Sequence, residues 1–111
     1  MKYKFRAYDE SNEVMEYGVG VDKGRPVKEG YQLYNTENTV YHSQLMQFTG
    51  LTDRIGREIY EHSELDGAYE VIFKDLRYSL RHIHNNDIID LYDYWRDKNG
   101  EIEVTREYTK V

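Results

Sequence analysis

Short segments in which apolar and polar residues alternate are the feature of this sequence that most constrains its fold. Residues 2–8 place Tyr3, Phe5 and Ala7 on one side and three basic residues on the other, which is the period of a half-buried strand. Uninterrupted apolar runs reach only two or three residues, as at 71–73, whereas a membrane-spanning helix needs about 20. The pattern therefore predicts a sheet built from hairpins and no membrane span.

Three antiparallel hairpins are predicted where two strand-like segments flank turn residues. The first joins residues 2–8 to 14–17, the second joins 40–51 to 57–60, and the third joins 69–73 to 76–82 around Lys74 and Asp75. In the third hairpin the predicted core residues are Tyr69, Val71, Phe73, Leu76, Tyr78 and Leu80. A short strand is also predicted at 31–34, and a final one at 101–108 with Ile102 and Val104 facing inward.

Residues 18–30 contain four of the eight glycines and the only proline, so a loop excursion is predicted there. The glycine spacing does not match a phosphate-cradling motif. A chain of 111 residues without cysteine holds one core and no disulfide framework. We therefore expect a single domain over residues 1–111.

Two turns share an Asp-x-x-Gly pattern, at Asp53–Gly56 and at Asp97–Gly100. In each turn the aspartate is expected to accept a backbone N–H, and the glycine to take the left-handed conformation that a side chain would penalise. The shared pattern predicts two similar hairpins.

A short helix is predicted over residues 87–97, because Ile88, Leu91, Tyr92 and Trp95 follow helical spacing. The carboxylates of this segment fall on the opposite side, and Asn86 or Asp87 is expected to cap the first turn. Its β-branched and aromatic content leaves a strand as the open alternative.

The charge is acidic and uneven, with −6 in total, −1 in residues 1–60 and −5 in residues 61–111. Such a surface repels phosphates, so nucleic-acid binding is not expected of the C-terminal half. A basic cluster that could contact DNA comprises Lys2, Lys4 and Arg6, but three positive charges are too few to outweigh the acidic surface. The acidity is typical either of ordinary solubility or of a face that meets a basic partner.

Two stretches carry a resemblance to a known family. Residues 4–9 (KFRAYD), with the return at 14–17, resemble the opening K-F-R-A-W/Y-D element of the YopX family, small proteins found mainly in phages and prophages of Gram-positive bacteria. Residues 46–61 (MQFTGLTDRIGREIYE) resemble the family's longer signature M-Q-Y/F-T-G-L-x-D-x-x-G-x-E-I-Y-E. This chain departs from the family at 62–65, where His-Ser-Glu-Leu replaces the usual G-D-I-V.

The resemblance implies a β-rich α+β fold with a small curved antiparallel sheet or partly open barrel, and a phage origin. It implies no activity, since the family has no established biochemical function, and so no catalytic residue is carried over. With no signal or transit segment expected at residues 1–6, the expected location is the host bacterial cytoplasm.

Catalytic and metal chemistry find little support in the residues. His82 and His84 would share one face of a strand and could offer two imidazoles to an ion, but no spacing supplies a third ligand. No serine lies in a nucleophile elbow. We therefore expect no enzyme, no cofactor and no metal site.

Two functions of different classes follow. The first is a non-enzymatic phage accessory protein that binds an unidentified host or phage protein or forms a homo-oligomer, since short sheets with unpaired edges commonly pair. The alternative is an acidic inhibitor that mimics nucleic-acid phosphates in the cleft of a host or defence protein. The tyrosines at 92 and 94 can serve recognition or structure. The predicted partner-binding residues are Asp87, Asp90, Asp93, Asp97, Glu101, Glu103, Tyr92 and Tyr94.

Overall fold

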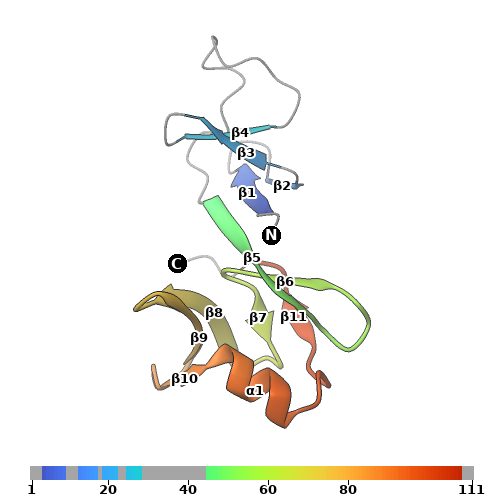
Figure 1. Cartoon of the computed structure of the whole chain (residues 1–111), viewed down its shortest axis with the longest axis vertical. Helices are drawn as coiled ribbons and strands as arrows, with labels where there is room; N and C mark the ends of the chain where they lie inside the picture. The colour runs from blue at the N-terminus through green and yellow to red at the C-terminus, as the bar shows by residue number, and fades with distance from the viewer. Residues whose placement is uncertain (1–3, 10–12, 18, 23–24, 29–44, 109–111) are drawn as a thin grey trace. The chain divides into compact units, whose positions relative to one another are not determined.

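The computed structural model describes residues 4–9, 13–17, 19–22, 25–28 and 45–108 (Figure 1). These residues belong to two compact units, Met1–Gln47 and Phe48–Val111. The strand pairs that the structure describes are antiparallel, and a single short helix lies among them. The predicted mainly β class with one short helix is confirmed, and the number of domains stays a prediction.

The first unit contains the first predicted hairpin. Strand β1 (Phe5–Asp9) pairs with β2 (Val14–Tyr17) and with the opening residues of β5 (Leu45–Thr52). The hairpin is therefore confirmed over its described residues, with residues 2 and 3 outside them, and β1 lies between β2 and β5. The strand predicted at 31–34 lies outside the described residues.

The prediction of a loop at 18–30 is wrong, because this segment contains a β-hairpin that was not predicted from the sequence. Strand β3 (Val19–Asp22) pairs with β4 (Arg25–Lys28), so that Val21 lies opposite Pro26. Three valines supply the strand propensity that the glycine and charge content obscured. Proline is tolerated because both strands of a two-stranded sheet are edges.

Burial in β1 differs from the simple alternation. Ala7 is buried as predicted, but Arg6 on the opposite side is buried too. Strand β1 has neighbours on both edges and also contacts β3, which leaves little of it open to water. Arg6 is thus part of the interior of this unit, and it contributes no exposed basic face.

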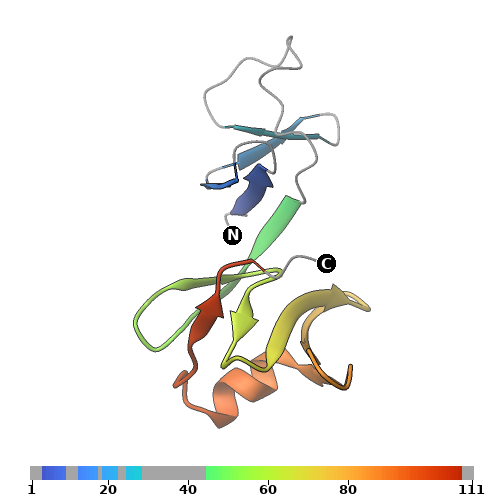
Figure 2. The same ribbon diagram turned by 180° about the vertical axis from the view of Figure 1, so that it is seen from behind.

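The second unit contains a curved five-stranded sheet in the order β10-β9-β8-β7-β11 (Figures 1 and 2). Its elements are β6 (Glu58–Tyr60), β7 (Glu64–Leu65), β8 (Tyr69–Lys74), β9 (Arg77–His82), β10 (Ile88–Asp90), α1 (Leu91–Asp97) and β11 (Val104–Arg106). The end of β5 pairs with β6, and β8 pairs with β9. The third predicted hairpin is therefore confirmed, and so is the second over its described residues, whereas residues 40–44 of its first strand lie outside them.

The core of the second unit collects side chains from the strands and the helix. It comprises Ile59, Leu65, Val71, Tyr78, Leu80, Leu91, Ile102 and Val104. The inward direction predicted for Ile102 and Val104 is confirmed.

The predicted core is wrong at the tip of the third hairpin. Phe73 is half exposed and Leu76 is 91% exposed. The two turn residues are Asp75 and Leu76, one position later than predicted, so Leu76 belongs to the turn and not to strand β9.

The helix is shorter than predicted. Ile88 and Ile89 pair with β9 as part of strand β10, and α1 begins only at Leu91. The cap is Asp90, not Asn86 or Asp87, since the Asp90 carboxylate accepts the backbone N–H of Asp93. The β-branched isoleucines favoured the strand alternative locally.

The Asp97–Gly100 turn ends this helix, so the prediction of a second hairpin there is wrong. The N–H of Asn99 donates to the carbonyl of Arg96, and the N–H of Gly100 donates to the carbonyl of Trp95. This is the Schellman pattern of a helix C-terminus, in which the left-handed residue here is Asn99. Gly100 does have the positive φ expected of it, at 73°.

Candidate functional site

The Asp53–Gly56 turn has the geometry that the sequence predicts. Asp53 Oδ1 accepts the backbone N–H of Ile55 at 3.1 Å and that of Arg57 at 2.8 Å. Gly56 has a φ of 89°, in the left-handed region. Burial opposes ionisation of Asp53, but hydrogen bonds from Val104, Arg57 and Ile55 outweigh it, and the pKa of this carboxyl is lowered. The turn is a structural device.

The acidic residues predicted to bind a partner do not form one free surface. Asp90 lies 3.8 Å from Arg77, and Asp93 forms an ion pair with Arg96 on the same helix. Glu103 faces two arginines, Arg54 at 3.6 Å and Arg57 at 3.8 Å. The remaining three are exposed and make no ion pair with the described residues, namely Asp87, Asp97 and Glu101.

The hydroxyls of Tyr92 and Tyr94, the two tyrosines predicted to bind a partner, form hydrogen bonds within the second unit. Tyr92 Oη donates to the carbonyl of Thr49 at 2.8 Å, and Tyr94 Oη donates to Asp66 Oδ2 at 2.6 Å. Burial and the neighbouring Asp90 carboxylate raise the pKa of Tyr92, while burial and Asp66 raise that of Tyr94 strongly. Both hydroxyls therefore anchor helix α1.

The two histidines considered for metal binding are adjacent but poorly arranged. His84 lies in the turn after β9 and not on the strand, because the strand ends at His82. The backbone N–H of His84 donates to His82 Nδ1 at 3.2 Å, which occupies that nitrogen. Among residues 4–108 that the structure describes, no group of three His, Asp or Glu side chains is placed to hold a metal ion.

A buried charge network that the sequence did not indicate joins β8, β9 and the segment before β7. Glu70 is almost fully buried, with Oε2 2.7 Å from His62 Nδ1 and Oε1 paired with Arg81. Burial alone would raise the pKa of Glu70, but the hydrogen bonds from His62 and Arg81 lower it. Arg81 also donates to Asn86 Oδ1 at 3.2 Å. Each partner of Glu70 is thus held in place, and the network serves the fold.

The tip of the β8–β9 hairpin is unusual in its turn residues. Asp75 has a φ of 52° and Leu76 a φ of 64°, the two left-handed residues of a type I′ hairpin turn. Asn-Gly and Asp-Gly are the favoured pairs at such a turn. Leucine is disfavoured there, and its side chain extends into solvent.

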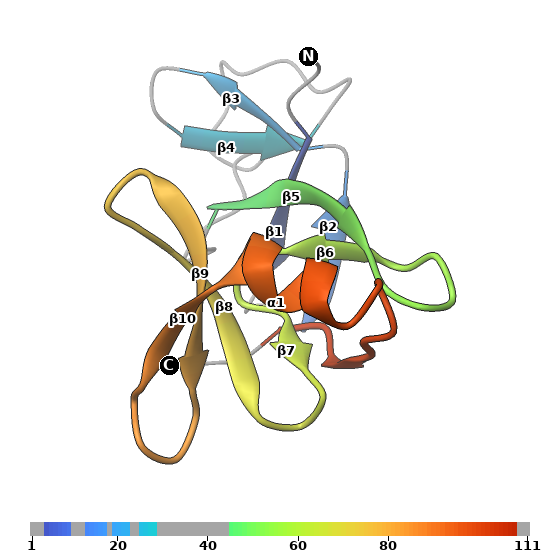
Figure 3. The ribbon, with the colours of Figure 1, turned by 60° about the horizontal axis from the view of Figure 1, so that its bottom comes forward.

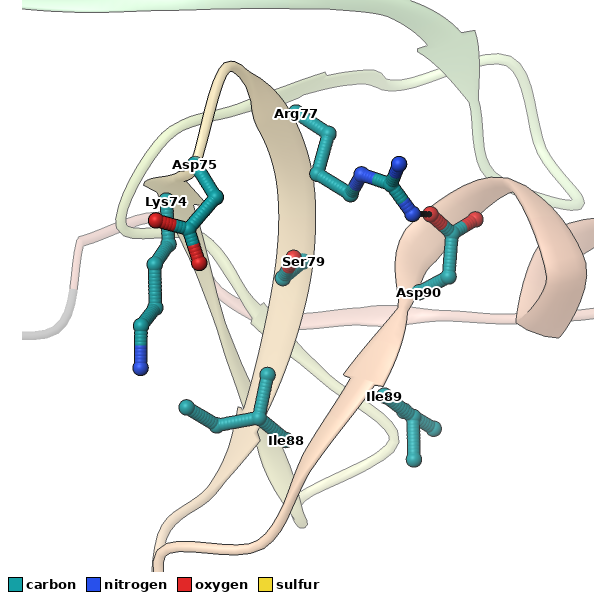
Figure 4. A pocket seen from close by; sticks show the side chains of 7 residues that line it. All are labelled: Lys74, Asp75, Arg77, Ser79, Ile88, Ile89 and Asp90. Atoms are coloured by element: carbon teal, nitrogen blue, oxygen red, sulfur yellow. Dashed lines mark ion pairs between the residues drawn. The ribbon is translucent and has the colours of Figure 1, made fainter.

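A shallow open pocket of about 460 Å³ lies beside this tip (Figure 4). Its lining comprises Lys74, Asp75, Arg77, Ser79, Ile88, Ile89 and Asp90. Ser79 lies on β9, between β8 and β10, with Arg77 and Asp90 facing each other on one side of it (Figure 4). The sequence missed this pocket because Ile88 was assigned to a helix stripe, whereas it belongs to the edge strand β10 next to β9 (Figure 3).

Comparison with known families decides the relationship that residues 46–61 suggest. The family model described as YopX protein matches residues 4–105, nearly the whole chain. The chain belongs to the YopX family. No curated protein sequence gives a significant match. Among the residues that the structure of this YopX-family chain describes, no helix is long and apolar enough to cross a membrane.

Proposed function

We propose that this YopX-family chain is a non-enzymatic protein-binding module that works through the tip surface. We define the tip surface as the exposed apolar residues of the β8–β9 hairpin and β10, namely Phe73, Leu76, Ile88 and Ile89. As a phage accessory protein it would act in the host bacterial cytoplasm, on a host or phage protein or on a second copy of itself.

The observation that carries the proposal is the state of Leu76. Leu76 has a left-handed backbone, which costs a non-glycine residue about 1–2 kcal/mol. Its side chain is also exposed to water, so the chain does not gain the free energy of burying it. Glycine or asparagine would fit this turn better. Folding of the chain alone gives no reason for leucine here, whereas an apolar anchor for a partner gives one.

Three further exposed apolar residues lie on the strands beside the tip, Phe73 and Ile89 on one face of the sheet and Ile88 on the other. Phe73, Ile88 and Ile89 are all exposed by more than a third. They lie on β8 and on β10, and β10 is an edge strand of the sheet. Exposed apolar groups next to an open sheet edge are typical of protein interaction sites.

An acidic nucleic-acid-mimicking inhibitor is the second candidate, supported by the three exposed carboxylates of the 87–101 segment that make no ion pair with the described residues. It is the weaker candidate because arginines face the other three acidic residues of the predicted set, and each ion pair reduces the local negative potential.

The proposal is tested with Leu76→Asn and a matched control. Ile55 is also an exposed aliphatic residue in a turn of the same unit, at 64% exposure, so Ile55→Asn removes similar apolar area elsewhere. Affinity capture from a Gram-positive host lysate, with light scattering for self-association, should give a bound protein or an oligomer for wild type and Ile55→Asn. Leu76→Asn should lose it. Equal capture by all three proteins would refute the tip surface, and a wild-type monomer that captures nothing would refute the binding module.

A further inference from the structure

The structure points to the chemistry of the partner. Given the proposed function, we infer that the pocket beside the tip binds an acidic, extended segment of the partner protein, with its carboxylate among Lys74, Arg77 and Ser79 on one face of the sheet and its apolar neighbours beside Ile89 on the other face.

Ser79 is the first reason for a hydrogen-bonding ligand. This residue is only 4% exposed, it lines the pocket, and its hydroxyl makes no hydrogen bond to any residue that the structure describes. The hydroxyl oxygen is not fully enclosed and opens onto the pocket, where water or a ligand can form a hydrogen bond with it. A ligand in the pocket would supply such a partner.

The balance of free donors and acceptors indicates that the ligand is an acceptor. Asp90 Oδ1 accepts the Asp93 N–H, and Oδ2 lies 3.8 Å from Arg77, so the charge of this carboxylate is already balanced by an ion pair. The Lys74 ammonium has no ion pair with the described residues, and the side chain of Arg77 is 67% exposed with most of its N–H groups open. Asp75, at the outer turn, is the one lining carboxylate left without a described donor.

The edge position of β10 favours an extended segment. Strand β10 ends the sheet order, so its outer edge carries backbone groups that can pair with an added strand. Ile88 and Ile89 offer an added strand one apolar side chain on each face of the sheet. A free anion would satisfy the cations but would leave both isoleucines in water, so the lining fits a peptide better than a small carboxylate.

The test uses the whole chain labelled with ¹⁵N and three capped pentapeptides, TVEVT, TVQVT and TVKVT, with glutarate as a small anion. Amide chemical shifts are followed during each titration at millimolar ligand. TVEVT should perturb the residues of the pocket and β10 and should bind about three times more tightly than TVQVT, the size of a single exposed charge pair. TVKVT and glutarate should bind more weakly than TVQVT.

Two arginine variants provide the matched comparison. Arg77 and Arg106 are equally exposed, at 67%, each faces one carboxylate at 3.8–3.9 Å, and they lie at opposite sides of the same sheet. Arg77→Gln should abolish the preference for TVEVT over TVQVT, whereas Arg106→Gln should keep it. Equal affinity of the two peptides for wild type, glutarate binding as tight as TVEVT, shifts confined to other strands, or no shift at all would each overturn the inference. The proposed function would survive these failures if partner capture still depended on Leu76.

Discussion

The Asp53 carboxylate accepts the backbone N–H of Val104, which lies 51 positions further along the chain, at 3.1 Å. The same carboxylate orders its own turn through the N–H groups of Ile55 and Arg57. One side chain therefore fixes a local turn and also the position of the last strand. The YopX signature at residues 46–61 includes this aspartate, so part of the family pattern has a structural cause.

Replacing this carboxylate should be costly. Asp53→Asn keeps the size but removes the charge and turns an acceptor into a donor facing backbone N–H groups, so we expect a loss of about 2–3 kcal/mol of unfolding free energy. Urea denaturation measures it. The exposed Asp97→Asn serves as control and should change stability by less than about 0.5 kcal/mol. A similar small effect at Asp53 would contradict the account.

Acid should destabilise the chain through Asp53 and Glu70. Both groups have lowered pKa values in the folded state, so their contribution is present above the unfolded pKa, about 4, and is lost as pH falls through the folded pKa. Unfolding free energies between pH 7 and pH 2.5 should show this loss. Glu70→Gln should be less stable than wild type at pH 7 and should lose less stability on acidification; an unchanged pH dependence would show that Glu70 is not part of the effect.

Two glycine substitutions should differ in cost. Gly56 and Gly100 both have positive φ, but a Cβ at Gly56 meets open space, whereas one at Gly100 would lie 3.2 Å from Trp95 Cζ2. Gly56→Ala should therefore cost about 1 kcal/mol from backbone strain, and Gly100→Ala should cost more because the indole must also move. Chemical denaturation compares them, and a shifted Trp95 emission is expected only for Gly100→Ala. Equal costs would rule out the indole contact as a constraint.

The helix anchor at Tyr94 has its own test. Tyr94→Phe removes the hydrogen bond to Asp66 and should cost about 1 kcal/mol of stability. In a spectrophotometric titration at high pH, wild type should show one more tyrosine that resists ionisation than the variant does, because the pKa of Tyr94 is raised. Identical titration curves would contradict the assigned contact.

The sequence predicts this fold best where the signal is local. The Asp53–Gly56 turn follows from residue types three positions apart, and the hairpins follow from alternation. The predicted core was wrong at the tip of the β8–β9 hairpin because a shift of the two-residue turn by one position moves Leu76 from the core to solvent. The prediction that Ile88 belongs to the helix was wrong because, over so short a segment, apolar residues can fit both helical and strand spacing.

The Glu70 network could not be predicted for a different reason. Glu70 and Arg81 are partners across the β8–β9 register, but His62 joins them only through the path of the chain before β7, including its own left-handed backbone at a φ of 68°. Ser79 likewise becomes informative only when its surroundings are known, since a serine in an alternating strand has no special signal. Residues that depend on long-range placement are the ones the sequence leaves undetermined.

The most direct test of the central claim measures folding and binding on the same variant. Leu76→Asn should leave the unfolding free energy unchanged or raise it by about 0.5 kcal/mol, because asparagine tolerates the left-handed turn better than leucine. The same variant should lose the partner or the self-association that wild type and Ile55→Asn retain. A variant that is clearly less stable than wild type and still binds would show that Leu76 serves the fold and not a partner.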